Sequence, residues 1–291
     1  MTMLKALLKT MRLRQWTKNG FVFFALIFDK QLFLREPFLR TIAGFFLFCL
    51  ISSAVYLFND ISDMEADRKH PEKKHRPIAS GELSVGAAWG AALALALISL
   101  SLGYLLAPLF SAFLAAYLII NIVYSRWLKH VPILDVLFVS TGFVLRVGAG
   151  VTLITVERFS PWLYVITTLF SLYLGFGKRR AEISLLEESA GSHRKVLDGY
   201  TLPLLDQFIT IVSGMTIVTY ALYTFFAENL PANHSMMLTI PFVVYGIFRY
   251  LQLIQTGHAA GAPDEVALKD RPLQITVTLW MLTVLVIFYF S

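Results

Sequence analysis

The sequence predicts an all-α fold of the polytopic membrane class, and three observations support this prediction. Hydrophobic residues make up 57% of the 291 residues and charged residues 15%, which is too apolar for an ordinary soluble domain. The apolar residues gather in stretches of about 20, the length that a helix needs to cross a membrane. The basic residues fall mainly in every second loop. We therefore expect one transmembrane helical domain over residues 1–291.

Nine stretches of the chain are predicted to span the membrane. The second of them leads directly into a charged segment, and proline residues stand at or near several boundaries, as is usual where helices begin or end. Asp29 and Lys30 interrupt the first stretch. In order, the predicted spans are residues 19–35, 39–58, 85–106, 109–125, 133–154, 161–177, 203–226, 236–255 and 272–290.

Positive charge predicts the orientation of these spans, because Lys and Arg are retained on the cytoplasmic side of short loops. The N-terminal tail and every second loop after it hold nineteen of the 25 Lys and Arg residues, whereas the other loops hold four. The N-terminus is therefore expected in the cytoplasm and the C-terminus outside. An odd number of crossings, such as nine, satisfies both expectations.

An acidic segment follows the second predicted span. Asp60, Asp63 and Asp67 stand at helical spacing, and Asn59 lies four residues before Asp63, so all four line one face if the helix continues. Three carboxylates on one face repel each other unless a cation lies among them. Mg²⁺ prefers oxygen ligands and is often held by carboxylates together with substrate phosphates. A solvated acidic helix end is the alternative, but the position at the membrane edge favours the metal site.

A basic segment comes immediately afterwards, from Arg68 to Arg76. Carboxylates that bind Mg²⁺, followed by a cationic loop, suit a diphosphate, because the ion bridges some phosphate oxygens and Lys or Arg neutralises others. Lys73 and Arg76 are the candidate phosphate ligands. Retention of positive charge in cytoplasmic loops would by itself explain several of these residues.

The acidic segment also carries a family resemblance. The stretch NDISDMEAD, residues 59–67, resembles the first aspartate-rich motif, NDxxDxxxD, of the UbiA-type intramembrane prenyltransferase superfamily. That family is a bundle of nine transmembrane helices with its active loops on the cytoplasmic side, so the resemblance implies a UbiA-like helical bundle. It also implies that Asn59, Asp60, Asp63 and Asp67 are catalytic, with the three aspartates binding Mg²⁺.

The sequence departs from that family after the sixth span. Members that prenylate aromatic acceptors carry a second aspartate-rich motif there, whereas this chain has Lys178, Arg179 and Arg180. A basic cluster suits an additional phosphate group. Six segments in order resemble the decaprenyl-phosphate phosphoribosyltransferase branch of the superfamily: RLRQWTKN (12–19), DRKHPEKKHRPIASG (67–81), YSRWLKHVPILDV (124–136), GKRRAE (177–182), HRKVLDGY (193–200) and ALKDRPLQ (267–274).

This branch resemblance implies a set of substrate-binding residues. Trp16 is an aromatic interface anchor within a basic juxtamembrane segment that could hold a lipid phosphate, and Glu182 is expected to orient one of the bases near it. The implied substrate-binding residues are Lys18, Lys73, Arg76, Tyr124, Lys129, Lys178, Arg179, Glu182, Arg194 and Tyr200.

The resemblance also implies the reaction. Enzymes of that branch join 5-phosphoribosyl diphosphate to a polyprenyl phosphate and release diphosphate, so these two molecules and the membrane are the expected partners, with Mg²⁺ as cofactor. No nucleic acid partner is expected, and assembly into a homo-oligomer stays open. We expect a multi-pass protein of the cell (inner) membrane, with the active site facing the cytoplasm.

Two other functions are weighed against this one. A conventional UbiA-type prenyltransferase with a prenyl diphosphate donor predicts a second acidic motif, which is not found at its expected place. A secondary transporter for anionic metabolites would bind its substrate near the middle of the bilayer, whereas the charged residues gather at one face.

Two ionisable sites have undecided roles. Arg146 lies inside the fifth predicted span, where a charged group is expected to face a partner or a polar cavity. Asp270 and Arg271 are adjacent, and they could pair with each other or help to close the site.

Overall fold

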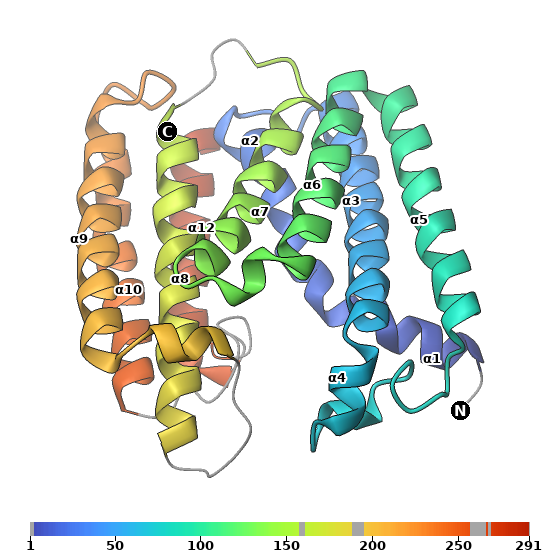
Figure 1. Ribbon diagram of the computed structural model, residues 1–291. Helices are drawn as coiled ribbons and strands as arrows, with labels where there is room; N and C mark the ends of the chain where they lie inside the picture. Colours follow the sequence, from blue (N-terminus) through green and yellow to red (C-terminus); the bar gives the residue numbers. More distant parts are fainter. Residues whose placement is uncertain (1–2, 157–160, 188–194, 257–265, 267–268, 291) are drawn as a thin grey trace. The chain divides into compact units, whose positions relative to one another are not determined.

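The computed structural model is built of α-helices and short 3₁₀ turns, and it describes residues 3–156, 161–187, 195–256, 266 and 269–290 (Figure 1). No strand occurs in those ranges. The α-helices are α1 (Met3–Thr10), α2 (Phe23–Phe28), α3 (Arg35–Ser62), α4 (Met64–Lys69), α5 (Val85–Leu106), α6 (Pro108–Arg126), α7 (Leu134–Val151), α8 (Pro161–Glu187), α9 (Leu202–Phe226), α10 (Ile240–Gln255) and α12 (Arg271–Phe290). The 3₁₀ turns are η1 (Leu13–Val22), η2 (Lys73–His75), η3 (Leu128–His130), η4 (Lys195–Gly199) and η5 (Ser235–Thr239).

The chain forms two compact units. The first comprises residues 1–27, 31–129 and 142–157, and the second comprises residues 28–30, 130–141 and 158–291. Helix α7 contributes its first half to the second unit and its remainder to the first. Each unit is therefore described by itself.

Seven helical segments within the described ranges are long and apolar enough to cross a membrane. They are α3, α5, α6, α7, α9, the continuous η5 and α10, and α12. Helix α8 is long enough at 27 residues, but Thr167, Thr168 and Ser171 are among the polar residues that dilute its apolar stretch. The count of nine spans is therefore not confirmed.

The first predicted span, residues 19–35, is wrong as a single α-helix. Residues 13–22 form the 3₁₀ turn η1, α2 contains only six residues, and α3 already begins at Arg35. Tertiary hydrogen bonds accompany this difference, because the Asn19 amide donates to Cys49 Sγ and Ser52 Oγ of α3 at 3.2 Å each. These contacts hold the segment against α3.

Helix starts follow from the sequence in the expected way. The Ser84 side chain accepts a hydrogen bond from the Ala87 amide and caps α5, and Thr201 does the same for α9 through Leu204. Proline occupies the first turn of α6, α9 and α10, where its missing N–H costs nothing.

In the first unit, α3 packs against both α5 and α6 (Figure 1). Phe48, Ile51 and Phe110 are fully buried in the core between these helices. The end of η1 also reaches this core, where a side chain at Gly150 of α7 would collide with the Val22 carbonyl oxygen. Helices α1 and α4 lie at the same end of α3 (Figure 1), and this end carries the acidic segment.

Arg146 of α7 is buried inside the first unit, as expected for an ionisable group that faces partners. Its Nε donates to Asn19 Oδ1 at 2.8 Å, Nη1 to the Gly142 carbonyl at 2.7 Å, and Nη2 to the Tyr117 hydroxyl at 2.9 Å. Its guanidinium carbon lies 5.2 Å from the ring centroid of Phe48. These bonds join α7, α6 and η1.

Replacing Arg146 with Leu should lower the stability of the protein. Removal of a buried charge is itself favourable, but Asn19 Oδ1 and the Tyr117 hydroxyl lose their partner, at a cost of about 1–3 kcal/mol for each buried group. The cost of these two unpaired groups should exceed the free energy gained by removing the buried charge. Thermal unfolding in detergent measures the effect, with exposed Arg126→Leu as the control, and an unchanged or raised melting temperature for Arg146→Leu would refute it.

In the second unit, α8 packs along α9, and α10 contacts both of them and α12 (Figure 1). Tyr173, Leu205 and Ile209 are fully buried in this core. Val196 and Leu197 of η4 are buried in the same core. Residues 195–199, which form η4, are thereby anchored against this core.

Candidate functional site

The acidic segment is divided by a break between two helices. Helix α3 ends at Ser62, Asp63 has φ −95° and ψ 2°, and α4 begins at Met64. Asp60 and Asp67 are buried, with 3% and 4% exposure, whereas the Asp63 side chain is 35% exposed. The predicted single helical face is therefore interrupted, and Asp63 is the most exposed of the three carboxylates.

Two arginines hold the buried carboxylates. Arg12 Nη2 donates to Asp60 Oδ1 at 2.6 Å, and Arg76 Nη1 donates to the same oxygen at 3.2 Å. The same Arg76 nitrogen donates to Asp67 Oδ2 at 2.7 Å. Arg76 therefore joins Asp60 and Asp67, and the repulsion between the two carboxylates is balanced by cations of the chain itself.

Asp63 has a cation of its own. The Lys129 ammonium of η3 donates to Asp63 Oδ1, so a predicted substrate-binding residue contacts a predicted metal ligand. Within the described ranges, no group of three or more Asp, Glu, His or Cys side chains is close enough to hold a metal ion in this arrangement. The three aspartates are thus paired with three basic residues, Arg12, Arg76 and Lys129.

Asn59 supplies an unused oxygen beside these acids. Its Oδ1 atom is buried and has no hydrogen-bond partner, although an unpaired buried acceptor normally costs free energy. Asn59, Asp60, Asp63 and Asp67 offer only oxygen donors, the kind that Mg²⁺ prefers, although the three carboxylates are not gathered around one point in this arrangement. The residues present fit this ion in their chemistry.

The loop that carries Arg76 is anchored by residues that follow Arg76 in the sequence. Ile78 and Leu83 are buried with 1% exposure each, and Arg68 Nε donates to the Ala79 carbonyl at 3.3 Å. Lys73 begins η2 and is half-buried. The backbone of this loop is therefore fixed, while the Arg76 side chain is 29% exposed.

The N-terminal basic segment lies against the same helix. The Trp16 indole donates to Ser53 Oγ of α3 at 3.0 Å, and Lys18 is half-buried in η1. Arg12 has φ 53° and ψ 56°, a left-handed conformation that non-glycine residues seldom adopt. This conformation accompanies the contact of Arg12 with Asp60.

A second charged cluster lies in the second unit, around Asp135 at the start of α7. Asp135 has 0% exposure, and its Oδ2 accepts a hydrogen bond from Arg179 Nε at 2.6 Å. Arg179 Nη1 donates to Glu182 Oε2 at 2.6 Å. Glu182 thus contacts Arg179, and Arg179 is buried between two carboxylates.

Tyr200 completes this cluster. Its hydroxyl donates to Asp135 Oδ1 at 2.6 Å and accepts from the Ile133 amide at 2.5 Å. Burial raises the pKa of Tyr200 above its ordinary value, and the hydrogen bond to Asp135 raises it further. The residue before Tyr200 is Gly199, which packs so closely against Pro132 that any side chain there would collide with the proline ring. Tyr200 is therefore a neutral donor to a buried carboxylate.

The structure decides one of the two roles that the sequence left open for Asp270 and Arg271, because Asp270 pairs with a residue of another helix. Asp270 contacts Arg249 of α10, at 2.8 Å and 3.3 Å, and not its neighbour Arg271. It also accepts from the Leu273 amide at 2.9 Å, so it caps α12, which fixes its side chain toward α10. The bond from Arg249 holds the pKa of Asp270 below its ordinary value.

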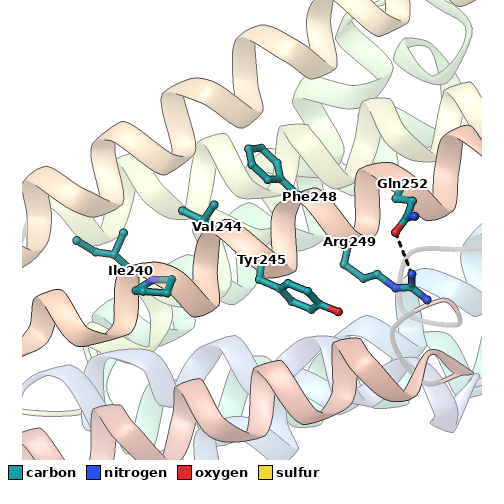
Figure 2. Close-up of a pocket in the computed structure, with 7 residues that line it drawn as sticks. Ile240, Val244, Tyr245, Phe248, Arg249 and Gln252 are labelled. Atoms are coloured by element: carbon teal, nitrogen blue, oxygen red, sulfur yellow. Dashed lines mark hydrogen bonds between the residues drawn. The ribbon is translucent and has the colours of Figure 1, made fainter.

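An apolar groove of about 640 Å³ runs along α10. Figure 2 shows its lining, with Arg249 bonded to Gln252 at one end. The lining residues are Ile240, Pro241, Val244, Tyr245, Phe248, Arg249 and Gln252. None of them belongs to the predicted site.

The remaining predicted residues divide between the two units. Tyr124 lies at the end of α6 and is half-buried, as is Lys178 of α8. Arg194 lies outside the described residues. The first unit thus pairs Arg76 with Asp60 and Asp67, and separately Lys129 with Asp63. In the second unit Asp135 bonds to both Arg179 and Tyr200, and Arg179 also bonds to Glu182.

Sequence reasoning missed two members of these clusters. Arg12 was assigned no site role, although it contacts Asp60, and its place in the basic N-terminal segment was the available signal. Asp135 was also left out, although an acid inside a predicted apolar span is itself a sign of function or of a paired charge. Both are held by the residues that the sequence did identify.

Comparison with known proteins gives a consistent result. The profile of the UbiA prenyltransferase family matches residues 21–266. A decaprenyl-phosphate phosphoribosyltransferase from Corynebacterium glutamicum is 34% identical over 97% of this chain and 86% of the relative. The enzyme of the same name from Mycolicibacterium smegmatis is 35% identical over 99% of this chain and 94% of the relative.

Solved structures agree on the fold. A UbiA homologue from Archaeoglobus fulgidus, solved bound to DMAPP and Mg²⁺, superposes with a TM-score of 0.73 at 17% sequence identity, covering 98% of this chain and 99% of that one. At this identity the likeness shows the fold alone.

Proposed function

This chain belongs to the UbiA prenyltransferase family, and from that premise we propose that it transfers a 5-phosphoribosyl group from 5-phosphoribosyl diphosphate to a polyprenyl phosphate, with release of diphosphate. The observation that carries this proposal is the similarity to decaprenyl-phosphate phosphoribosyltransferases over nearly the whole length of both chains. Phosphoribosyl transfer also suits the basic residues of α8, where an acidic motif would favour a prenyl diphosphate.

The chain's residues would act mainly by binding and electrostatics. The bond between ribose C1 and the diphosphate oxygen breaks, the diphosphate keeps the electron pair, and a phosphate oxygen of the lipid forms the new bond to C1 from the other face. The nucleophile is already an anion, so no strong general base is required. Positioning and stabilisation of charge then supply the acceleration.

The acidic segment is the proposed place of the cofactor. Asn59, Asp60, Asp63 and Asp67 would hold Mg²⁺, and their all-oxygen donor set with the unpaired Asn59 Oδ1 supports this assignment. When bound, the ion would neutralise negative charge on the leaving diphosphate. Lys73, Arg76 and Lys129 would bind phosphate oxygens beside it.

The second cluster would bind a further phosphate group of the substrates. Lys178 and Arg179 provide its positive charge. Asp135 and Glu182 hold Arg179 in one orientation, and Tyr200 in turn holds Asp135. Lys18, Tyr124 and Arg194 complete the proposed substrate-binding set. The distribution of Lys and Arg supports an active site that faces the cytoplasm from the cell membrane.

A diphosphate-release assay tests the proposal. The purified chain is incubated with 5-phosphoribosyl diphosphate, a polyprenyl phosphate and Mg²⁺, and released diphosphate is measured. Release should require both substrates and should stop when Mg²⁺ is chelated. Release that does not depend on the lipid would indicate hydrolysis and would contradict the proposal.

A further inference from the structure

Arg76 occupies an unusual place for a phosphate-binding residue, because one of its nitrogen atoms contacts two proposed metal ligands. Nη1 lies 3.2 Å from Asp60 Oδ1 and 2.7 Å from Asp67 Oδ2. Resting on the proposed function, we propose that Arg76 is a positioning residue that couples the binding of Mg²⁺ to the binding of diphosphate. It holds the two carboxylates until a diphosphate draws its guanidinium away and leaves them for the ion.

The first step of the argument is competition for the same oxygens. Asp60 and Asp67 are almost fully buried, where two negative charges are costly unless cations balance them. Arg76 provides that balance. A divalent ion at these carboxylates would meet the guanidinium at close range, and the like charges repel each other. Mg²⁺ by itself must therefore displace Arg76 in order to bind.

The second step is the alternative partner that a diphosphate offers. Guanidinium groups form paired, charge-assisted hydrogen bonds with phosphate oxygens. Arg76 can change partner through its side chain alone, because Ile78 and Leu83 anchor the loop and its own side chain is partly exposed. Arg12 stays bonded to Asp60 Oδ1 at 2.6 Å, so that carboxylate keeps one cation during the exchange.

The exchange fixes the signs of three measurable quantities. If Arg76 competes with the ion, replacing Arg76 with Gln should raise the affinity for Mg²⁺ alone. The same change should lower the affinity for diphosphate alone, because a phosphate ligand is lost. Coupling between two ligands is reciprocal and is typically about 5–150-fold. We expect the factor by which diphosphate raises the affinity for Mg²⁺ to be about tenfold smaller in the variant than in the parent protein.

Isothermal titration calorimetry on the full chain in detergent measures these affinities. Mg²⁺ alone, inorganic diphosphate alone, and Mg²⁺ in the presence of diphosphate are titrated into the parent protein and into Arg76→Gln. Lys74→Gln is the matched control, because it removes the same charge from an exposed position two residues away. Direct contact between the ion and the diphosphate occurs in all three proteins, so the difference between the two variants isolates Arg76.

The inference is supported if Arg76→Gln binds Mg²⁺ alone more tightly and diphosphate more weakly than Lys74→Gln does. Equal coupling in both variants, or weaker binding of Mg²⁺ alone by Arg76→Gln, would overturn it while leaving the proposed function intact. Failure of the parent to bind either ligand would overturn both. If Arg76→Gln does not fold, Arg76→Lys replaces it, because Lys keeps the charge but lacks the planar guanidinium. Its affinities for Mg²⁺ alone and for diphosphate alone should change in the same directions by smaller amounts. Unchanged affinities would contradict the inference.

Discussion

Replacing Asp60 with Asn should reduce kcat by about 10²–10³-fold, the range seen when one preorganised electrostatic contact is removed from an active site. Asn keeps the shape of the side chain and removes its charge. Asp60 is buried and accepts hydrogen bonds from both Arg12 and Arg76, so the change removes one proposed metal ligand and leaves two cations with less negative charge between them.

The matched control for this variant is Glu65→Gln. Glu65 lies in the same charged segment, but its side chain is 71% exposed and contacts only Arg68 among the ion pairs of the described residues. It should keep nearly full activity, because exposed pairs contribute about 0–1 kcal/mol. Diphosphate release gives kcat for both variants, and size-exclusion chromatography confirms that both fold. Equal activity of Asp60→Asn and the parent at saturating Mg²⁺ would show that Asp60 does not bind the ion.

Replacing Arg179 with Ala should lower kcat/KM for 5-phosphoribosyl diphosphate by at least about tenfold. A charge-assisted hydrogen bond from Arg179 to a phosphate would contribute about 1.5–3 kcal/mol, enough for a loss of this size, and the change also removes the bonds to Asp135 and Glu182. It also removes the positive charge that is proposed to bind a phosphate. The loss should appear as a raised KM for this substrate, with the KM for the lipid less affected.

A second variant separates binding from folding in this cluster. Arg180→Ala removes the neighbouring charge of α8, which contacts Asp206 at 2.6 Å and the Ile254 carbonyl, so it controls for general loss of charge and packing. Thermal unfolding of both variants shows how much stability each has lost. If Arg179→Ala keeps the parent's kcat/KM, or if Arg180→Ala loses as much as Arg179→Ala does, the assignment of Arg179 to phosphate binding is wrong.

Much of the fold was accessible from the sequence, because apolar length and charge placement have direct physical meaning in a membrane. The UbiA-like, all-helical fold is confirmed. The first span failed because hydropathy does not register that Asn19 bonds to α3. Hydropathy cannot distinguish an apolar segment that packs against other parts of the protein from one that crosses the lipid as a helix.

Most of the predicted site residues lie in two charged clusters of the described residues, but their contacts were harder to predict. Asp60 and Asp67 share Arg76 although the predicted single helical face is interrupted between them. The pairing of Asp63 with the Lys129 ammonium was not predictable, because the two residues are 66 positions apart along the chain. The contact between Asp135 and Tyr200 spans 65 residues, and periodicity along one segment carries no information about contacts of this range.

Donor competition tests the central claim most directly. The purified chain is given a polyprenyl phosphate, Mg²⁺, and equal amounts of 5-phosphoribosyl diphosphate and a prenyl diphosphate, and the lipid products are identified by mass spectrometry. Phosphoribosyl transfer predicts one new lipid, which has gained a phosphoribosyl group, and an unconsumed prenyl diphosphate. A product that has gained a prenyl group, with 5-phosphoribosyl diphosphate left intact, would contradict it.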